Sequence, residues 1–172
     1  MAILPIITAP DRRLKVKSKP VDAVDDKIRQ FLDDMLETMY DAPGIGLSAV
    51  QVGVAKCLIT VDVSHDDEDN APLYMVNPEI VHYSDDKGIY NEGCLSLPDQ
   101  FADLERPEGI TVEYLDYNGE PQKLLADGLL SRCIQHEMDH LKGRLFVDHI
   151  SAVKRGMILR KLDKARRQKQ TA

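Results

Sequence analysis

Residues 128–141, GLLSRCIQHEMDHL, constrain the fold of this 172-residue chain more than any other stretch. Their apolar side chains recur at helical spacing, Asp127 precedes them as a helix cap, and Gly143 follows as a stop. We therefore predict an amphipathic helix with one buried side. His136 and His140 are four residues apart, so their rings project from the same face, one turn apart. Together these features predict a cleft beside a buried helix.

The HEMDH pattern within this helix indicates a metal site with hydrolytic chemistry. Two imidazoles on one face can bind one ion. Glu137 lies beside that face, where it can reach a water molecule on the ion without being a ligand. Two ordinary surface histidines are the alternative, but the apolar residues around them bury much of the helix and argue against it. A catalytic ion needs a third protein ligand and one open position.

The third ligand is not fixed by any local pattern. Cys133 lies seven residues from His140, about 10 Å along the helix axis, so we interpret it as a wall of the site. Cys94, in NEGCLSLP, follows a glycine that lets the backbone approach an ion, and the next amide, that of Leu95, is free to point inward unless a strand pairs with it. Taken alone, Cys94 is more typical of a small buried side chain. The histidines without a local signal are His65, His82 and His149.

Residues 42–53, APGIGLSAVQVG, form a third unusual stretch. The glycine spacing matches neither dinucleotide-binding nor P-loop patterns, so phosphate binding is not predicted. The amide of Gln51 can donate a hydrogen bond to a developing oxyanion. On its own, Gln51 is more typical of a surface or structural amide.

The remaining pattern predicts one α+β domain over residues 1–172, with grouped helices rather than alternating ones. An amphipathic helix over residues 24–40 comes first. Two strands follow, one at residues 54–63 and one at PLYMVNPEIVHYS with an interruption at Pro78. A hairpin is then predicted around the turn Asn118-Gly119, and a last helix from about Ser151.

The net charge of −7 is unevenly distributed. Residues 151–172 hold eight Lys or Arg and one acid, a charge of +7, so residues 1–150 carry −14. A basic helix of this kind is either a contact for an anionic partner or a solvated helix, and charge alone favours solvation. Three cysteines, an odd number, are typical of a reducing compartment. Without an apolar run that spans a bilayer or a recognisable leader, we predict a cytoplasmic protein with no membrane contact.

Three stretches taken together, GIGLSAVQ, EGCLS and QHEMDH, resemble the signature motifs of the peptide deformylases in order and separation. The resemblance covers most of the chain. It implies the compact α+β deformylase fold, with antiparallel strands, a central metal-binding helix and a C-terminal helix at residues 151–172. The implied activity is hydrolysis of the N-formyl group from the formylmethionine of N-formylmethionyl nascent peptides, which releases formate. One alternative is a zincin-type endopeptidase, which EGCLS and the lack of a ligand motif beyond His140 disfavour. The other is a structural-metal or nucleic-acid-binding module, which would need a fourth ligand that no local signal supplies.

The resemblance also implies roles by position. The implied ligands of one divalent ion are Cys94, His136 and His140. The ion implied in most bacterial members is Fe²⁺, while this donor set also suits Zn²⁺, Co²⁺ and Ni²⁺. Glu137 becomes the general acid and base. The implied oxyanion donors are Gln51 and the backbone amide of Leu95.

Four further residues correspond to substrate-binding positions. The backbone of Gly46 is implied to hold the substrate, and the methionine pocket is implied to be lined by Ile45, Leu129 and Cys133. The basic C-terminal helix corresponds to one that docks bacterial relatives on the ribosome. Departures from the family pattern, which bear on substrate preference rather than on the reaction, are Ser48 for alanine, Phe101 for arginine in some relatives, and Arg132 at an often apolar position.

Overall fold

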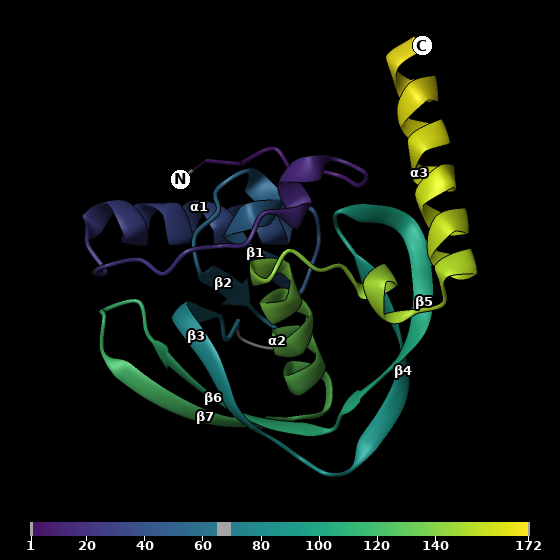
Figure 1. Ribbon diagram of the computed structural model, residues 1–172. Helices are drawn as coiled ribbons and strands as arrows, with labels where there is room; N and C mark the ends of the chain where they lie inside the picture. Colours follow the sequence, from purple (N-terminus) through teal and green to yellow (C-terminus); the bar gives the residue numbers. More distant parts are fainter. Residues whose placement is uncertain (1, 65–69, 172) are drawn as a thin grey trace.

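The computed structural model describes residues 2–64 and 70–171 (Figure 1). His65 lies outside the described residues. The main helices are α1 (Asp26–Asp41), α2 (Gly128–Leu141) and α3 (Ala152–Thr171), with short 3-10 helices η1 (Arg12–Lys15), η2 (Ala49–Val52) and η3 (Phe146–His149). The strands are β1 (Gly46–Ser48), β2 (Leu58–Val61), β3 (Leu73–Tyr83), β4 (Lys87–Cys94), β5 (Leu97–Pro107), β6 (Gly109–Leu115) and β7 (Pro121–Asp127).

The strands form two antiparallel sheets. Five pair in the order β1-β2-β3-β6-β7, and β4 and β5 form a separate hairpin. Helix α2 lies between the large sheet and the β4–β5 hairpin (Figure 1). Its buried side, with Ile134 and Met138, packs against Ile59 and Val112 of the sheet. This packing fixes the helix face that carries the histidines, and the predicted α+β arrangement of antiparallel strands, a central helix and a C-terminal helix is confirmed.

Two other apolar clusters hold the remaining helices. Leu32 and Met35 of α1 pack with Leu47 of β1 and Leu58 of β2, which anchors the glycine-rich segment. Leu162 of α3 is buried in a cluster with β5 and η3. Most of α3 extends away from the rest of the chain (Figure 1). Among the described residues, no helix combines the length and apolar content that crossing a bilayer requires.

The predicted helix positions are confirmed within two residues. Helix α1 begins after Asp25, whose side chain accepts a hydrogen bond from the Ile28 amide at 2.9 Å. Asp127 occupies the cap position of α2, but its side chain makes no capping hydrogen bond. Gly143 has a φ of 75°, a conformation that favours glycine.

Two strand predictions were wrong or incomplete. Strand β3 continues through Pro78, because a register shift between Val76 and Glu79 places an irregularity where the proline cannot donate a hydrogen bond. Asn77, with a φ of 50°, anchors this irregularity by bonding both backbone groups of Val21. The predicted strand 54–63 is shorter, at β2. The β4–β5 hairpin was not predicted.

Candidate active site

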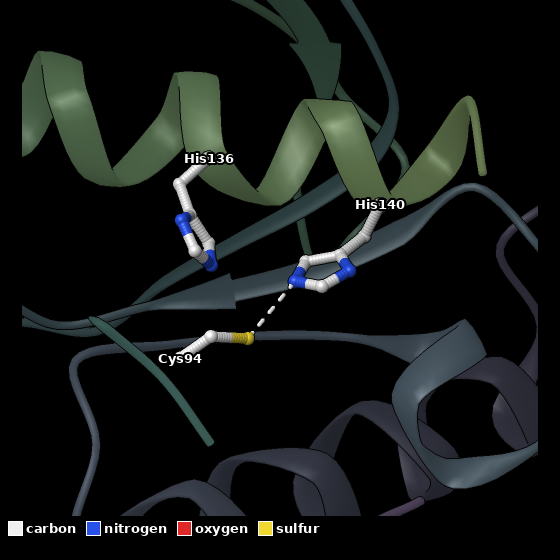
Figure 2. A group of neighbouring side chains, drawn as sticks. All are labelled: Cys94, His136 and His140. Carbon is white, nitrogen blue, oxygen red and sulfur yellow. Dashed lines mark hydrogen bonds between the residues drawn. The ribbon is translucent and has the colours of Figure 1, made fainter. Parts of the chain in front are cut away.

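Three side chains from two elements point toward one another (Figure 2). Cys94 ends β4, while His136 and His140 project from one face of α2. One ligand atom from each of the three residues lies within 4.8 Å of the other two. The Sγ of Cys94 is 3.4 Å from Nε2 of His140. Cys133 is outside this group.

The surroundings of the histidines fit a bound cation. Nδ1 of His136 is 3.0 Å from Oε1 of Glu92, an interaction that orients the ring and leaves Nε2 for an ion. His140 is fully buried. Thiolate and imidazole are donors that suit Fe²⁺, Zn²⁺, Co²⁺ and Ni²⁺. Within the described part of the chain the group consists of three potential ligands, and an ion bound by three protein ligands would keep one coordination position open, as a catalytic ion requires.

Glu137 is buried beside His136, with 2% of its surface exposed. Burial raises the pKa of its carboxyl group to about 7. The hydroxyl of Ser48 lies 3.3 Å from Oε1 of Glu137 and donates at 3.0 Å to its backbone oxygen. A methyl group at Gly46 would lie 2.8 Å from Oε2 of Glu137 and 2.7 Å from Sγ of Cys133. Gly46 therefore leaves the space that the carboxylate occupies.

The side chain of Gln51 is oriented by two hydrogen bonds. Its Oε1 accepts from the Ser48 amide at 2.9 Å, and because a backbone N–H can only donate, this contact fixes which end carries the nitrogen. Its Nε2 then donates to Oγ of Ser96 at 3.0 Å and lies 3.6 Å from Sγ of Cys94. Leu95 lies in the turn between β4 and β5, outside both strands. Both proposed oxyanion donors therefore border Cys94.

The cleft that contains these groups has a volume of about 580 Å³. Its lining includes Gln51, Cys94, His136 and Glu137, together with all four of the predicted substrate-binding residues, Ile45, Gly46, Leu129 and Cys133. Ile45 and Leu129 are exposed by 42% and 44%, so apolar surface faces the cleft before any ligand binds. Such a cleft, apolar with a few polar groups at one end, is typical of small-molecule and peptide sites.

Comparison with known proteins assigns the family. The profile of a family described as "Polypeptide deformylase" matches residues 3–156. Peptide deformylase of Pelagibacter ubique is 55% identical, over 95% of this chain and 95% of that protein. That of Rhizobium meliloti is 52% identical over 96% and 95%. The crystal structure of peptide deformylase from Ehrlichia chaffeensis superposes with a TM-score of 0.94 at 42% identity, over 98% of this chain and 99% of that chain.

The chain belongs to the polypeptide deformylase family. A second structure of the Ehrlichia chaffeensis deformylase, in complex with actinonin, has a TM-score of 0.92 at 44% identity, over 96% of this chain and 98% of that chain. The resemblance carried by the three motifs is thus confirmed, and the family match disfavours a zincin-type endopeptidase.

One part of this deformylase site was not predicted from sequence. Arg106 of β5 donates to Glu92 in a two-pronged contact at 2.5 and 2.9 Å, and to Asp139 at 3.0 Å. Asp139 also contacts His149 at 2.8 Å. Burial alone would raise the pKa of Glu92, but hydrogen bonds from His136 and Arg106 hold it at about 2. A buried ionic network therefore supports the His136 ring.

Two histidines without a sequence signal lie away from the three ligands. His149 belongs to the network around Asp139, and His82 is exposed on β3. Ser96, which holds the Gln51 amide, was also not predicted. Its place in the EGCLS motif was the only available signal, because a serine next to a ligand has no spacing rule of its own.

Proposed function

We propose that Cys94, His136 and His140 hold one divalent metal ion, and that Glu137, Gln51 and the Leu95 amide work beside it to remove the formyl group from the N-terminal formylmethionine of new polypeptides, with release of formate. The reaction is that of the family; the assignment of residues is our proposal. The observation that carries it is that one potential ligand atom from each of the three residues lies within 4.8 Å of the others, beside a cleft that Cys94 and His136 help to line.

When bound by these residues, the ion would supply Lewis-acid chemistry, lowering the pKa of a water molecule and polarising the formyl carbonyl. We propose Fe²⁺ as the ion in the cell, in keeping with the family. Zn²⁺, Co²⁺ and Ni²⁺ suit the same ligands. The thiolate of Cys94 is also the ligand most easily oxidised, so exposure to air should inactivate the enzyme.

Glu137 transfers the proton as general base and then as general acid. Its carboxylate accepts a proton from the attacking water as the new C–O bond forms at the formyl carbon, and it then delivers that proton to the departing amine nitrogen. The buried position of Glu137 keeps bulk water from competing for this proton. The Ser48 hydroxyl and the space at Gly46 hold the carboxylate in one place.

Gln51 and Leu95 stabilise charge. As water adds, negative charge develops on the formyl oxygen. Nε2 of Gln51, 3.6 Å from Sγ of Cys94, and the amide of Leu95, the residue after Cys94, donate hydrogen bonds to that oxygen. Loss of one such donor typically costs about 10²- to 10³-fold in rate. Ile45, Leu129 and Cys133 form the wall against which the methionine side chain lies, and Gly46 supplies backbone groups for the peptide.

Formate release from formyl-Met-Ala-Ser, measured on protein purified without oxygen and loaded with Fe²⁺, tests the proposal. We expect turnover that is abolished when a chelator removes the ion and restored when Fe²⁺ is added back, because the ion activates the water. Metal content should approach one per chain. Absence of formate from the iron-loaded protein would refute the proposed function, and cleavage of casein would favour a protease.

We also propose that α3 docks this enzyme on the ribosome, through Lys and Arg side chains that meet RNA phosphates. Arg160, Lys161 and Lys164 are exposed on α3, which extends away from the rest of the chain (Figure 1). The basic excess of residues 151–172 contrasts with the acidic remainder. Docking on the ribosome would place the enzyme in the cytoplasm, where the sequence predicts it.

Changing Arg160, Lys161 and Lys164 together to glutamine should weaken binding to ribosomes in sedimentation assays. The slope of log affinity against log salt concentration should become smaller in magnitude by about 0.9 for each phosphate that the protein no longer neutralises. Turnover of formyl-Met-Ala-Ser should not change, because these side chains are remote from the cleft. The matched control changes Lys17, Lys27 and Lys87, exposed lysines outside α3, to glutamine. Equal ribosome affinity of the α3 variant and this control would contradict the proposal.

A further inference from the structure

Arg132 is a positively charged residue in the lining of the cleft, and it has no role in the proposed reaction. It lies on α2, one turn before His136, and belongs to the cleft wall. Its guanidinium carbon is 3.5 Å from the centre of the Tyr90 ring. Tyr90 belongs to β4, so this contact links the helix and the hairpin that carry the proposed metal ligands.

The contact with Tyr90 holds the guanidinium by its face. At 3.5 Å the guanidinium must lie nearly parallel to the ring. If it stood edge-on, one of its nitrogens would come much closer to the ring than the roughly 3.5 Å of an ordinary van der Waals contact. This is a cation–π contact, which leaves the N–H groups at the edge of the plane. Tyr90 is itself fixed, since its hydroxyl donates to Glu108 at 2.9 Å.

The charge of Arg132 has no ionic partner among residues 2–64 and 70–171. In these ranges, no carboxylate lies within 4.0 Å of its guanidinium nitrogens. Of the acids that line the cleft, Glu92 is paired with Arg106, and Glu137 is buried. The third acid of the cleft lining, Asp99, is exposed to solvent. A preorganised, partly buried guanidinium of this kind is suited to a carboxylate from a ligand.

The position of Arg132 indicates which part of a substrate it meets. It precedes His136 by four residues, about 6 Å along the helix axis. An extended peptide covers that distance in about two residues. On the basis of the proposed function, we propose that Arg132 selects nascent peptides with Asp or Glu as the second or third residue, by pairing with the side-chain carboxylate. The chain's net charge of −7 opposes this pairing only weakly, because salt screens charges beyond about 10 Å.

Matched peptides test this selection. Formyl-Met-Glu-Ala-Ser and formyl-Met-Ala-Glu-Ser, each amidated at the C-terminus, are compared with their Gln counterparts, so that only the side-chain charge differs. We expect the iron-loaded enzyme to favour Glu over Gln in kcat/KM by about tenfold at one of the two positions, equal to about 1.4 kcal/mol. Rising NaCl should reduce this ratio. The salt series needs no variant.

Variants then assign the ratio to the guanidinium. Arg132→Met should bring the Glu/Gln ratio to about one, and Arg132→Lys, which keeps the charge without the planar fork, should give an intermediate ratio. Arg12→Met removes an exposed arginine of η1 and should leave the ratio and the turnover unchanged.

Three results would overturn the inference: a wild-type ratio near one at both positions, a ratio that salt does not change, or a ratio that Arg132→Met preserves while all turnover falls equally. The last would mean that Arg132 only supports the cleft wall. Failure of the proposed function gives a different result, because the wild-type enzyme would then release no formate from any of the four peptides, and the inference would fall with it.

Discussion

Changing Glu137 to glutamine should lower kcat/KM for formyl-Met-Ala-Ser by about 10²- to 10⁴-fold, the usual contribution of a positioned acid and base. Glutamine has nearly the same shape, and it fits the space beside Gly46. It cannot accept the proton of the attacking water or return it to the amine. The loss therefore reports proton transfer rather than a change in the cleft. Formate release in single turnovers is the direct measurement.

Two further readouts separate this loss from damage to the site. Metal content should equal that of the wild type, because Glu137 is not among the three ligands. Thermal stability should not fall, since burying an ionised carboxylate is unfavourable and glutamine carries no charge. Ser48→Ala is the matched control: it removes the hydroxyl 3.3 Å from Oε1 but keeps the carboxylate, so its effect should be far smaller. If Glu137→Gln stays within tenfold of wild type, Glu137 is not the acid and base.

The helix that carries His136 and His140 was predictable because its signals are local. Apolar spacing, a cap position at Asp127 and a stop at Gly143 all lie within or beside residues 128–141, and side chains four apart on a helix must share a face. The convergence of Cys94 and Gln51 on that face was not local information. It came from the combination of three motifs that resembles a known family, and the structure brings the same residues together.

The β4–β5 hairpin was missed for a physical reason. Both strands are exposed along much of their length, so they lack the alternation of apolar and polar residues that predicts a half-buried strand. Their turn, at Leu95 and Ser96, contains none of the glycine or asparagine signals that mark tight hairpins. Pairing between Arg106 and Asp139, 33 residues apart, has no sequence pattern at all. Such a pair forms only when the fold brings the two residues together, so it cannot be predicted from local sequence.

Changing Arg106 to methionine should lower the free energy of unfolding by about 3–5 kcal/mol, the range for breaking a buried ion pair from one side. Arg106 is 6% exposed and is the cation that contacts both Glu92 and Asp139. Methionine fills similar space but removes the guanidinium from both carboxylates, so that Glu92 keeps only His136 and Asp139 only His149 as side-chain partners. Because Glu92 orients His136, the same change should also weaken metal retention. Urea unfolding at a fixed excess of metal gives the free energy, since ion binding itself adds stability.

Two variants make the measurement specific to the buried network. Arg13→Met breaks an exposed pair with Asp11 and should leave the free energy of unfolding nearly unchanged, because solvent screens such pairs. Arg106→Lys keeps the charge but loses the two-pronged contact, so its stability should fall between those of Arg106→Met and the wild type. A loss below about 1 kcal/mol for Arg106→Met, the size expected of a surface pair, would mean that the network does not stabilise the fold. Metal affinity would then be measured instead, because Glu92 contacts His136, a proposed ligand, directly at 3.0 Å.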